Sequence, residues 1–198
     1  MAAKPTPRTR KTVRKSDEKL GTRRLEVRHA LMKDVRGIAA LVRRVYDDMP
    51  AYTHGEIRGQ INNFPAGCFV ALLDEKVVGY CATMQIASTL AFEDHTWDEI
   101  TGNGFGSRHD PTGDWLYGYE MCVDPKVRGV RIGRRLYEEL LAALRARGIH
   151  SAFGVIALPN EASVALHERL GFVKVAHLRE VGFKFDRWID VGYWQLSL

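Results

Sequence analysis

A cluster of arginine and glycine residues from Arg128 to Arg134 has the clearest chemical potential in this sequence. It reads Arg-Gly-Val-Arg-Ile-Gly-Arg and leads into a run with an aliphatic residue every four positions, which is typical of a helix. The first turn of a helix has unpaired backbone N–H groups and the positive end of the helix dipole. Gly129 and Gly133 let a ligand approach the backbone closely. These features predict a site for a pyrophosphate group.

The spacing of this turn excludes two common phosphate-binding motifs. It contains neither G-x-x-x-x-G-K-[ST] nor G-x-G-x-x-G, so it is neither a Walker loop nor a dinucleotide-binding turn. An ordinary strand-to-helix turn with a solvated basic face is the alternative interpretation. A second glycine-rich stretch, over 101–106, is followed by no helical pattern, so we do not interpret it as a nucleotide loop.

Glu120 is a carboxylate in an otherwise mostly apolar strand, and it is the best candidate for a general base. The strand over 115–123 is rich in aromatic and β-branched residues. Alternation places Glu120 and Cys122 on one face, and Met121 and Val123 on the other. Burial of a carboxylate raises its pKa, as a base working near neutral pH requires. A paired structural glutamate is the alternative.

Periodicity and turn residues predict the elements that must position these groups. In order they are a strand over 24–30, helices over 33–48 and 52–64, a hairpin of strands 68–73 and 76–87, the strand 115–123, a helix ending near Gly148, a strand over 151–157, a short helix over 160–170, and a last strand pair, 172–179 and 190–198, linked by 180–189. The polar, glycine-rich segment 88–114 contains no predicted helix. Its length favours a lid or substrate loop.

Composition and charge indicate one globular domain preceded by a basic arm. The 198 residues are 45% hydrophobic and 27% charged, as is usual for a globular chain. Residues 1–24 hold nine of the 29 basic residues and two of the 24 acids, a net charge of +7. The rest has a net charge of −2, so binding of nucleic acid by the folded part is not expected. We therefore predict a disordered arm over 1–23 and one domain over 24–198.

The cysteines and the termini indicate a cytoplasmic protein. Cys68, Cys81 and Cys122 lie far apart on apolar stretches, and no C-x-x-C occurs, so no zinc site or disulfide framework is expected. A nucleophilic Cys122 stays the alternative to a buried thiol. No run of 18 apolar residues and no secretory signal is present. Histidines and acids of segment 88–114 fit no metal-ligand spacing.

The turn after the strand 115–123 resembles the acyl-CoA motif of the GCN5-related N-acetyltransferase (GNAT) superfamily, V-x-P-x-x-[QR]-G-x-G-x-[GA]. The matching residues are Val123, Pro125, Arg128, Gly129 and Gly133, while Arg131 stands where the middle glycine usually is. The order of predicted elements over 24–198 is also the order of that fold. The resemblance implies an α/β fold with a mostly antiparallel mixed sheet, splayed between its fourth and fifth strands, and flanking helices. In that fold the pantetheine arm of CoA fills the gap.

Two parts of the chain resemble two branches of this superfamily. Residues 98–104, 109–114 and 127–137 are similar to acetyltransferase domains fused to amide-forming or amide-hydrolysing enzymes, such as the N-acetylglutaminylglutamine synthetase type. In that group arginine also stands at the Arg131 position. Residues 158–167 and 188–195 resemble phosphinothricin-type acetyltransferases, which acetylate the α-amine of a glutamate-like compound. A mosaic or engineered origin stays open.

The resemblance also implies roles for individual residues. His167 lies in the pattern N-x-x-[SA]-x-x-x-[Y/H]-x-x-x-G-F, at the point where many members carry a tyrosine near the CoA sulfur. An imidazole titrates near neutral pH and can protonate a thiolate; a helix-surface or capping histidine is the alternative. The expected CoA contacts are Met121, Cys122, Val123, Arg128, Gly129, Val130, Arg131, Ile132, Gly133, Arg134, Asn160 and Ser163. Backbone N–H groups near Met121 and Cys122 are the implied oxyanion donors, and helix capping is the alternative role of Asn160.

We therefore expect an enzyme that transfers acetyl from acetyl-CoA, without a metal, to the primary amine of an amino acid, a glutamate-like compound or a short peptide. Two alternatives stay open. A non-catalytic module that senses acyl-CoA would bind it without turnover, and an RNA- or ribosome-associated protein would use the basic arm and bind less tightly as salt rises. The acceptor and the association into a homodimer are not determined by the sequence.

Overall fold

The structure is a computed structural model that describes residues 23–46, 51–90, 93, 95–184 and 186–198. The remaining residues include nearly all of the predicted basic arm, so that prediction lies outside the described part of the chain.

Seven strands form one mixed sheet in the order β1-β2-β3-β4-β5-β7-β6. The strands are β1 (Leu25–His29), β2 (Cys68–Leu73), β3 (Lys76–Ile86), β4 (Trp115–Val123), β5 (Ser151–Leu158), β6 (Val173–Lys184) and β7 (Arg187–Ser197). The α-helices are α2 (Val35–Val45), α3 (His54–Asn63), α4 (Trp97–Thr101), α5 (Ile132–Arg145) and α6 (Glu161–Arg169). All neighbouring strands are antiparallel except the parallel pair β4 and β5. The predicted α/β class with a mostly antiparallel mixed sheet is confirmed.

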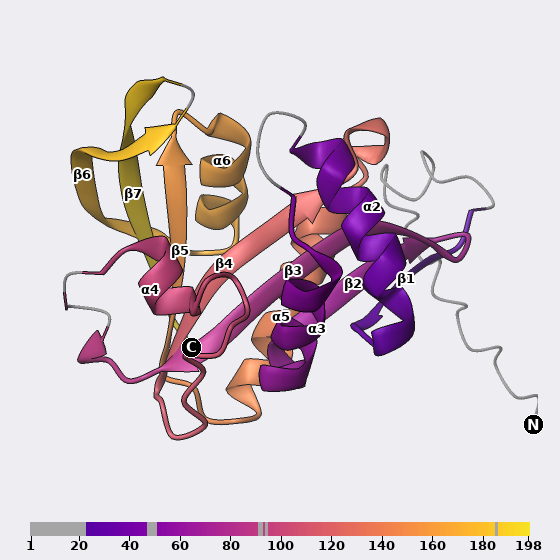
Figure 1. The fold of residues 1–198 in the computed structure, drawn as a ribbon, viewed down its shortest axis with the longest axis horizontal. Coiled ribbons are helices and arrows are strands. Elements are labelled where there is room, and N and C mark those ends of the chain that lie inside the picture. Colours follow the sequence, from indigo (N-terminus) through magenta and orange to yellow (C-terminus); the bar gives the residue numbers. More distant parts are fainter. Residues whose placement is uncertain (1–22, 47–50, 91–92, 94, 185) are drawn as a thin grey trace, which may run out of the picture.

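Helices cover both faces of the sheet. In Figure 1, α2 and α3 lie in front of the central strands and α5 lies behind them. The apolar stripe of α5, predicted from its four-residue spacing, is buried in one core, where Leu136, Leu140 and Leu144 are at most 1% exposed. The apolar side chains of α2 and α3 form a second core on the opposite face, together with Cys122 of β4. Burial on both faces explains why the central strands are almost continuously apolar.

The strands β4 and β5 diverge along their length. Their pairing runs from Trp115–Ser151 to Gly118–Gly154 and stops there, whereas β4 continues to Val123 and β5 continues to Leu158. Beyond Gly118, β4 is paired with β3 alone among the described strands. The resemblance implied this splayed arrangement, and the strand register confirms it.

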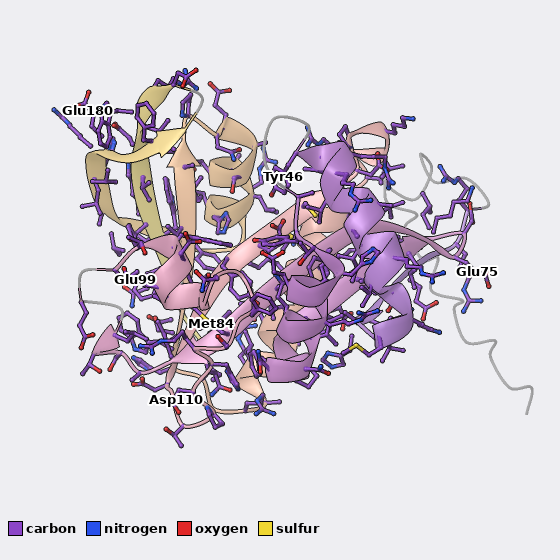
Figure 2. All side chains as sticks on the ribbon, viewed as in Figure 1. Tyr46, Glu75, Met84, Glu99, Asp110 and Glu180 are labelled. Carbon is purple, nitrogen blue, oxygen red and sulfur yellow. The ribbon has the colours of Figure 1, made fainter. Side chains whose placement is uncertain are left out.

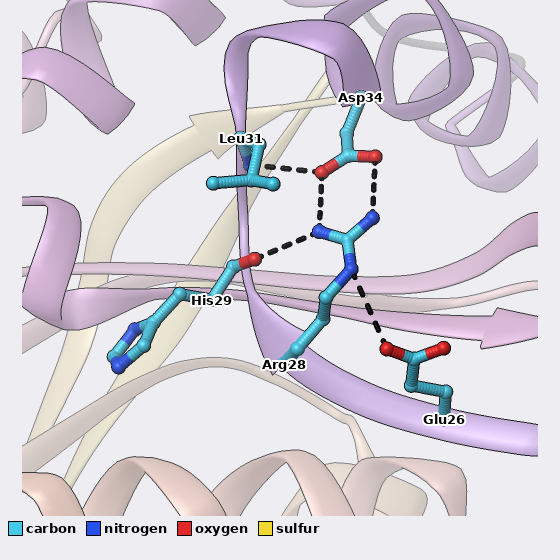
Figure 3. Close-up of polar contacts among 5 residues, drawn as sticks. All are labelled: Glu26, Arg28, His29, Leu31 and Asp34. Carbon is cyan, nitrogen blue, oxygen red and sulfur yellow. Dashed lines mark hydrogen bonds and ion pairs between the residues drawn. The ribbon is translucent and has the colours of Figure 1, made fainter.

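An ion pair fixes the turn between β1 and α2 (Figure 3). The guanidinium group of Arg28 donates to both carboxylate oxygens of Asp34, at 2.7 and 2.9 Å, and to the carbonyl of His29 at 2.8 Å. The backbone N–H of Leu31 donates to the same carboxylate at 2.8 Å. Burial acts to raise the pKa of Asp34, but the hydrogen bonds outweigh it and leave that pKa below its ordinary value. The direction in which α2 leaves the sheet is therefore set by a charged, hydrogen-bonded turn.

The predicted helix-free segment 88–114 contains one short helix, so that part of the prediction is wrong. Helix α4 begins after Thr96, whose hydroxyl accepts from the N–H of Glu99 while the Glu99 carboxylate accepts from the N–H of Thr96. This capping box is readable in the sequence as Thr-x-x-Glu. The helix ends at Gly102, in the left-handed conformation with φ 63°. It was missed because five residues are too few to display a period.

The linker predicted over 180–189 is also wrong, because β6 and β7 extend through most of it. Phe183 is paired with Trp188, and Gly182 with Ile189. A register shift between Leu178 and Gly182 interrupts the ladder. This β-bulge breaks the alternation on which the sequence prediction depended.

None of the helices in the described part of the chain combines the length and the apolar character needed to cross a membrane.

Candidate active site

Glu120 lies on β4 close to the point where β4 and β5 separate, and it is 8% exposed. Its carboxylate accepts a hydrogen bond from the hydroxyl of Tyr46, which follows the last residue of α2, at 3.1 Å. Figure 2 labels Tyr46 at that end of the helix. Cys122 packs with α2 and α3, whereas Met121 and Val123 pack with α5. The predicted division of the two strand faces is therefore confirmed.

The surroundings of Glu120 give its carboxyl group a pKa suited to proton transfer near neutrality. Burial raises the pKa to about 7, against hydrogen bonds from Tyr46, Cys122 and Tyr52 that lower it. A carboxyl group with this pKa is about half ionised at neutral pH, which is the favourable range for a general base. The adjacent thiol of Cys122 has a raised pKa, chiefly because it is buried and secondly because of Glu120. The thiol stays protonated and is a poor nucleophile.

Three tyrosines around Glu120 were missed by the sequence analysis. Besides Tyr46, they are Tyr52, which precedes α3, and Tyr119, the neighbour of Glu120 on β4. The hydroxyl of Tyr119 is buried without a hydrogen-bond partner among the described residues. The register of β3 and β4 shifts at this position, between Ala82 and Thr83, so simple alternation does not predict the direction of Tyr119. No short sequence pattern predicts that Tyr46 and Tyr52 lie beside β4, because they come from separate helix ends.

The segment 95–114 packs over this group of tyrosines. The rings of Trp97 and Tyr52 stack with centroids 6.1 Å apart. A Cβ at Gly106 would lie 2.7 Å from the hydroxyl of Tyr119, so glycine allows the loop to approach there. The side-chain amide of Gln60 on α3 donates to the carbonyl of Gly104 at 2.8 Å. The loop is therefore anchored beside Glu120, and its role as a lid or substrate loop stays a prediction.

Two backbone N–H groups of β4 are directed toward β5, away from β3. The N–H of Asp124 donates to the carbonyl of Val78 on β3 at 2.9 Å. Alternation along β4 then directs the N–H of Cys122 toward β3 and those of Met121 and Val123 toward the gap. The N–H of Met121 hydrogen-bonds the Glu120 carboxylate. The oxyanion role of Met121 and the CoA contact of Val123 stay predictions. For Cys122 this geometry does not favour the oxyanion role that the resemblance implied.

The turn between β4 and α5 has the form of an anion site. Asp124 accepts a hydrogen bond from the N–H of Lys126 at 3.0 Å and opens a 3-10 turn over Pro125–Val127. The first backbone hydrogen bond of α5 runs from Arg135 to the carbonyl of Arg131, so the N–H groups of the preceding turn have no acceptor within the helix. Gly129 has φ 86°, a left-handed conformation that glycine adopts readily.

Arg131 occupies a left-handed backbone conformation, with φ 63° and ψ 25°, at the N-cap of α5. Such a conformation is ordinary for glycine and unfavourable for arginine. The left-handed conformation therefore explains why glycine usually stands at this position of the motif. In this chain the arginine adopts this conformation and adds an exposed cation at the helix start.

The other predicted residues of this turn divide into exposed and buried groups. Arg128 is exposed, and Arg134 is paired with Glu138 at 2.7 Å. Val130 and Ile132 are buried in the core, so only their backbone can meet a ligand. A Cβ at Gly133 would lie 3.2 Å from the side chain of Leu166. This glycine therefore allows α5 and α6 to approach each other.

His167 is buried on α6, with both ring nitrogens in hydrogen bonds. Its Nδ1 lies 2.8 Å from the carbonyl of Ser163 and its Nε2 lies 2.7 Å from the hydroxyl of Tyr137 on α5. A carbonyl can only accept, so Nδ1 carries the proton; in a neutral ring Nε2 then accepts from Tyr137. A Cβ at Gly154 would lie 2.4 Å from Nε2, so this glycine makes room for the ring.

Burial lowers the pKa of His167, and the hydrogen bond to Ser163 only partly opposes it. The imidazole is therefore mainly neutral at pH 7. This favours a hydrogen-bond acceptor for Tyr137 over a charged acid, and the acid role stays a prediction. Asn160 caps α6, because its side-chain oxygen accepts from the N–H of Ser163 at 3.1 Å. Tyr137 was missed in the sequence, although a tyrosine on the apolar face of a helix signals a buried hydroxyl that needs a partner.

The three cysteines are free and buried, as predicted. Within the described ranges no group of three or more His, Cys, Asp or Glu side chains is arranged to hold a metal ion.

Comparison with known proteins bears directly on this arrangement. The model of the family described as "Acetyltransferase (GNAT) family" matches residues 36–172, which include both Glu120 and the turn after β4.

Three curated relatives are similar over parts of the chain. Probable hydrolase YhcX of Bacillus subtilis is 33% identical over 147 residues, which are 72% of this chain and 29% of that protein. Phosphinothricin N-acetyltransferase of Streptomyces viridochromogenes is 40% identical over 82 residues, 41% of this chain and 45% of the relative. L-amino acid N-acyltransferase MnaT of Escherichia coli is 35% identical over 104 residues, 48% of this chain and 60% of the relative. The chain thus matches less than two thirds of the length of each.

Among solved structures, that of yncA from Salmonella typhimurium with its cofactor acetyl-CoA has the same fold, with a TM-score of 0.67. It is 22% identical and covers 88% of this chain and 94% of its own.

Proposed function

This chain belongs to the acetyltransferase (GNAT) family, and from that premise we propose that it transfers the acetyl group of acetyl-CoA to the primary amine of a small, amino-acid-like molecule. The observation that carries the proposal is the placement of Glu120. A buried carboxyl group with a pKa of about 7 lies at the separation of β4 and β5, beside three tyrosines.

The residues present fit acetyl-CoA. The turn 129–134 offers backbone N–H groups that have no acceptor within the helix, and Arg128 and Arg131 are exposed beside them, which suits the pyrophosphate. The gap-facing N–H group of Val123 suits the amide-rich pantetheine arm. When bound, this co-substrate supplies an acetyl thioester.

Glu120 would accept the proton that an ammonium group must lose before its nitrogen can attack the thioester carbon. The new bond is N–C, the broken bond is C–S, and the thiolate of CoA takes a proton. The N–H of Met121, which hydrogen-bonds the Glu120 carboxylate in this structure, is the group that we assign as donor to the thioester oxygen as negative charge develops there. We propose that the hydroxyl of Tyr137, which is hydrogen-bonded to His167, lies near the leaving sulfur.

The amino-acid class of the acceptor rests on two relatives, which are named for phosphinothricin and for L-amino acids. The resemblance of residues 158–167 and 188–195 to the phosphinothricin type points the same way. Fold alone does not determine an acceptor. The resemblance of the preceding part to synthetase-fused acetyltransferase domains stays a prediction.

The test is release of free CoA from acetyl-CoA by the full chain over a panel of L-amino acids, glutamate analogues and dipeptides. Matched N-acetylated compounds serve as controls, because they offer no free amine. We expect release only with a free amine, and a product heavier by one acetyl group in mass spectrometry. Binding of acetyl-CoA without turnover over the whole panel would contradict the proposal and favour an acyl-CoA sensor. RNA binding that weakens steeply with salt would favour the third interpretation.

A further inference from the structure

We propose that Arg44 and Asp124 are positioning residues for this reaction, because their ion pair and the Tyr46–Glu120 hydrogen bond clamp the end of α2 onto β4 at two points. The inference rests on the proposed function and adds to it two residues outside the turn 128–134 and the reacting groups.

The first point of the clamp is the ion pair. The Nε and Nη2 atoms of Arg44 each lie 3.0 Å from the same carboxylate oxygen of Asp124. The Nη1 atom of Arg44 donates to the carbonyl of Ala40, one turn earlier on α2, at 3.0 Å. Asp124 is only 7% exposed. The guanidinium plane is thus held from both sides, by its own helix and by the strand end.

Asp124 is itself firmly fixed. Its N–H donates to the carbonyl of Val78, and its second carboxylate oxygen accepts from the N–H of Lys126. The same carboxylate therefore starts the turn that leads to the predicted phosphate site and anchors α2. The Asp124 carboxylate, held by these hydrogen bonds, therefore fixes the position of the end of α2.

The second point is Tyr46, two residues after Arg44. It lies beyond the helix end, with φ −119° and ψ 79°, and its N–H donates to the carbonyl of Val42. Its hydroxyl reaches Glu120, which shares a strand face with Asp124. The two residues are four positions apart, which is about 13 Å along the backbone of a strand. Arg44 of α2 and Tyr46 just beyond it are thus attached to two positions on one face of the β4 chain, so a shift of the helix end moves Tyr46 away from Glu120.

Loss of the clamp has a specific chemical consequence. The hydrogen bond from Tyr46 lowers the pKa of Glu120 against the effect of burial, so its loss would raise that pKa. The other titratable groups near this pair are Tyr52, Tyr119, Cys81, Cys122 and Arg128. None of these side chains comes from the last turn of α2, so a change at Arg44 acts on Glu120 through Tyr46.

The test compares Arg44→Gln, Asp124→Asn and Tyr46→Phe in the full chain. In each, the acidic limb of the pH profile of kcat/KM should move to higher pH by roughly one unit, with a roughly ten-fold loss below the limb. Arg44→Gln combined with Tyr46→Phe should shift the limb no further than Tyr46→Phe alone. Arg44→Lys should restore part of the effect.

Arg43→Gln is the matched control, since it removes the same charge from the neighbouring exposed residue and should leave the profile unchanged. A limb that moves in Tyr46→Phe but stays in place in Arg44→Gln overturns the clamp, even if the melting temperature falls. NMR titration of the Glu120 carboxyl carbon measures the pKa of Glu120 directly and needs no turnover. The signal is assigned by its absence in Glu120→Gln. An unshifted titration in Arg44→Gln therefore refutes the clamp, whereas absent acetyl transfer refutes only the proposed function.

Discussion

At the scale of single residues, Glu120 shows how an environment converts an ordinary side chain into a reactive group. The carboxyl group is no different from the other 23 acidic side chains in the chain. Its pKa differs because burial penalises the charged form, while a few hydroxyl and thiol groups restore part of the lost solvation. The proton affinity of Glu120 thus depends on the packing of α2 and α3 against β4.

Replacing Glu120 with glutamine is expected to lower kcat by roughly 10²–10⁴-fold, the usual contribution of a general base. Glutamine keeps the shape but cannot accept the proton. The wild-type rate should rise as pH increases through about 7, where Glu120 becomes ionised, and the variant should lack that limb. Higher pH should partly rescue it, because more acceptor amine is already deprotonated. Steady-state kinetics from pH 5 to 9 measure this, and wild-type rates throughout would make Glu120 structural.

Arg128 and Arg131 should each contribute to acetyl-CoA affinity. Replacement of either by alanine is expected to weaken binding by roughly 1–3 kcal/mol, the scale of a charge-assisted hydrogen bond. Arg131→Gly should be milder than Arg131→Ala, because glycine relieves the left-handed backbone. Calorimetric titration with acetyl-CoA measures the affinities, and unchanged values in both alanine variants would remove the phosphate site from this turn.

At the scale of elements, two polar junctions hold the helices that surround the gap. The buried pair Tyr137–His167 joins α5 to α6, and the ion pair Arg28–Asp34 fixes the start of α2. At both junctions, directional hydrogen bonds fix one orientation of the helix, whereas apolar packing alone would tolerate several orientations.

Tyr137→Phe and His167→Gln are expected to be coupled. Each change disturbs one partner of a buried hydrogen bond, at a cost of about 1–3 kcal/mol in the free energy of unfolding. The double variant should lose less than the sum of the two, since the second change removes a bond that is already broken. Urea denaturation measures the cycle, with the exposed Glu168→Gln as control. Strict additivity would show that the two side chains do not interact in solution.

Asp34→Asn should lower the free energy of unfolding by about 1–3 kcal/mol at pH 7, because the change breaks a charged hydrogen-bond pair. The folded-state pKa of Asp34 lies below its ordinary value. Its contribution is therefore complete at neutral pH and is lost as pH falls below about 4 toward that lowered pKa. Denaturation at pH 7 and pH 3 should show the difference between wild type and variant shrinking.

Glu26→Gln is the control for that experiment. Glu26 is 3.8 Å from Arg28 and about half exposed, so its effect should stay within about 0.5 kcal/mol. A difference between wild type and Asp34→Asn that is constant with pH would contradict the assigned role of the carboxylate.

At the scale of the whole molecule, the outer edge of the sheet is the surface on which we expect a second copy to pair. β6 is the last strand in the sheet order, and the apolar side chains Val173, Val175, Leu178, Val181 and Phe183 of this strand are 43–66% exposed. Twelve residues span about 40 Å, long enough for an interface of the usual 800 Å² per partner. Antiparallel pairing of two β6 strands would satisfy the exposed backbone of both copies.

Sedimentation velocity at two protein concentrations tests this association. The wild type should contain a dimer, and Val181→Lys should shift the population to the monomer. Leu31→Lys is the matched control, because Leu31 is 46% exposed but lies beside β1, at the other edge. A monomeric wild type, or equal effects of the two variants, would exclude β6 as the contact.

Local sequence alone determined most of the elements and predicted a phosphate site in the turn 128–134. The bounds of β2 and β4 were predicted to the residue, because apolar runs flanked by Asp, Gly or Pro have sharp ends. The turn 128–134 and the candidate base Glu120 could be read in the same way, since helix starts and strand faces follow from neighbours within a few positions.

Only the tertiary structure decided what surrounds Glu120 and His167. Tyr46 and Tyr52 reach Glu120 from beside helix ends, and Tyr137 reaches His167 from α5, across 30 to 74 positions of sequence. No local periodicity predicts contacts over such a separation. The bulge at Tyr119 and the one near Gly182 shift the alternation of side chains, so strand patterns fail there. The pKa of a buried group depends on all atoms packed around it, and that packing exists only after the chain has folded.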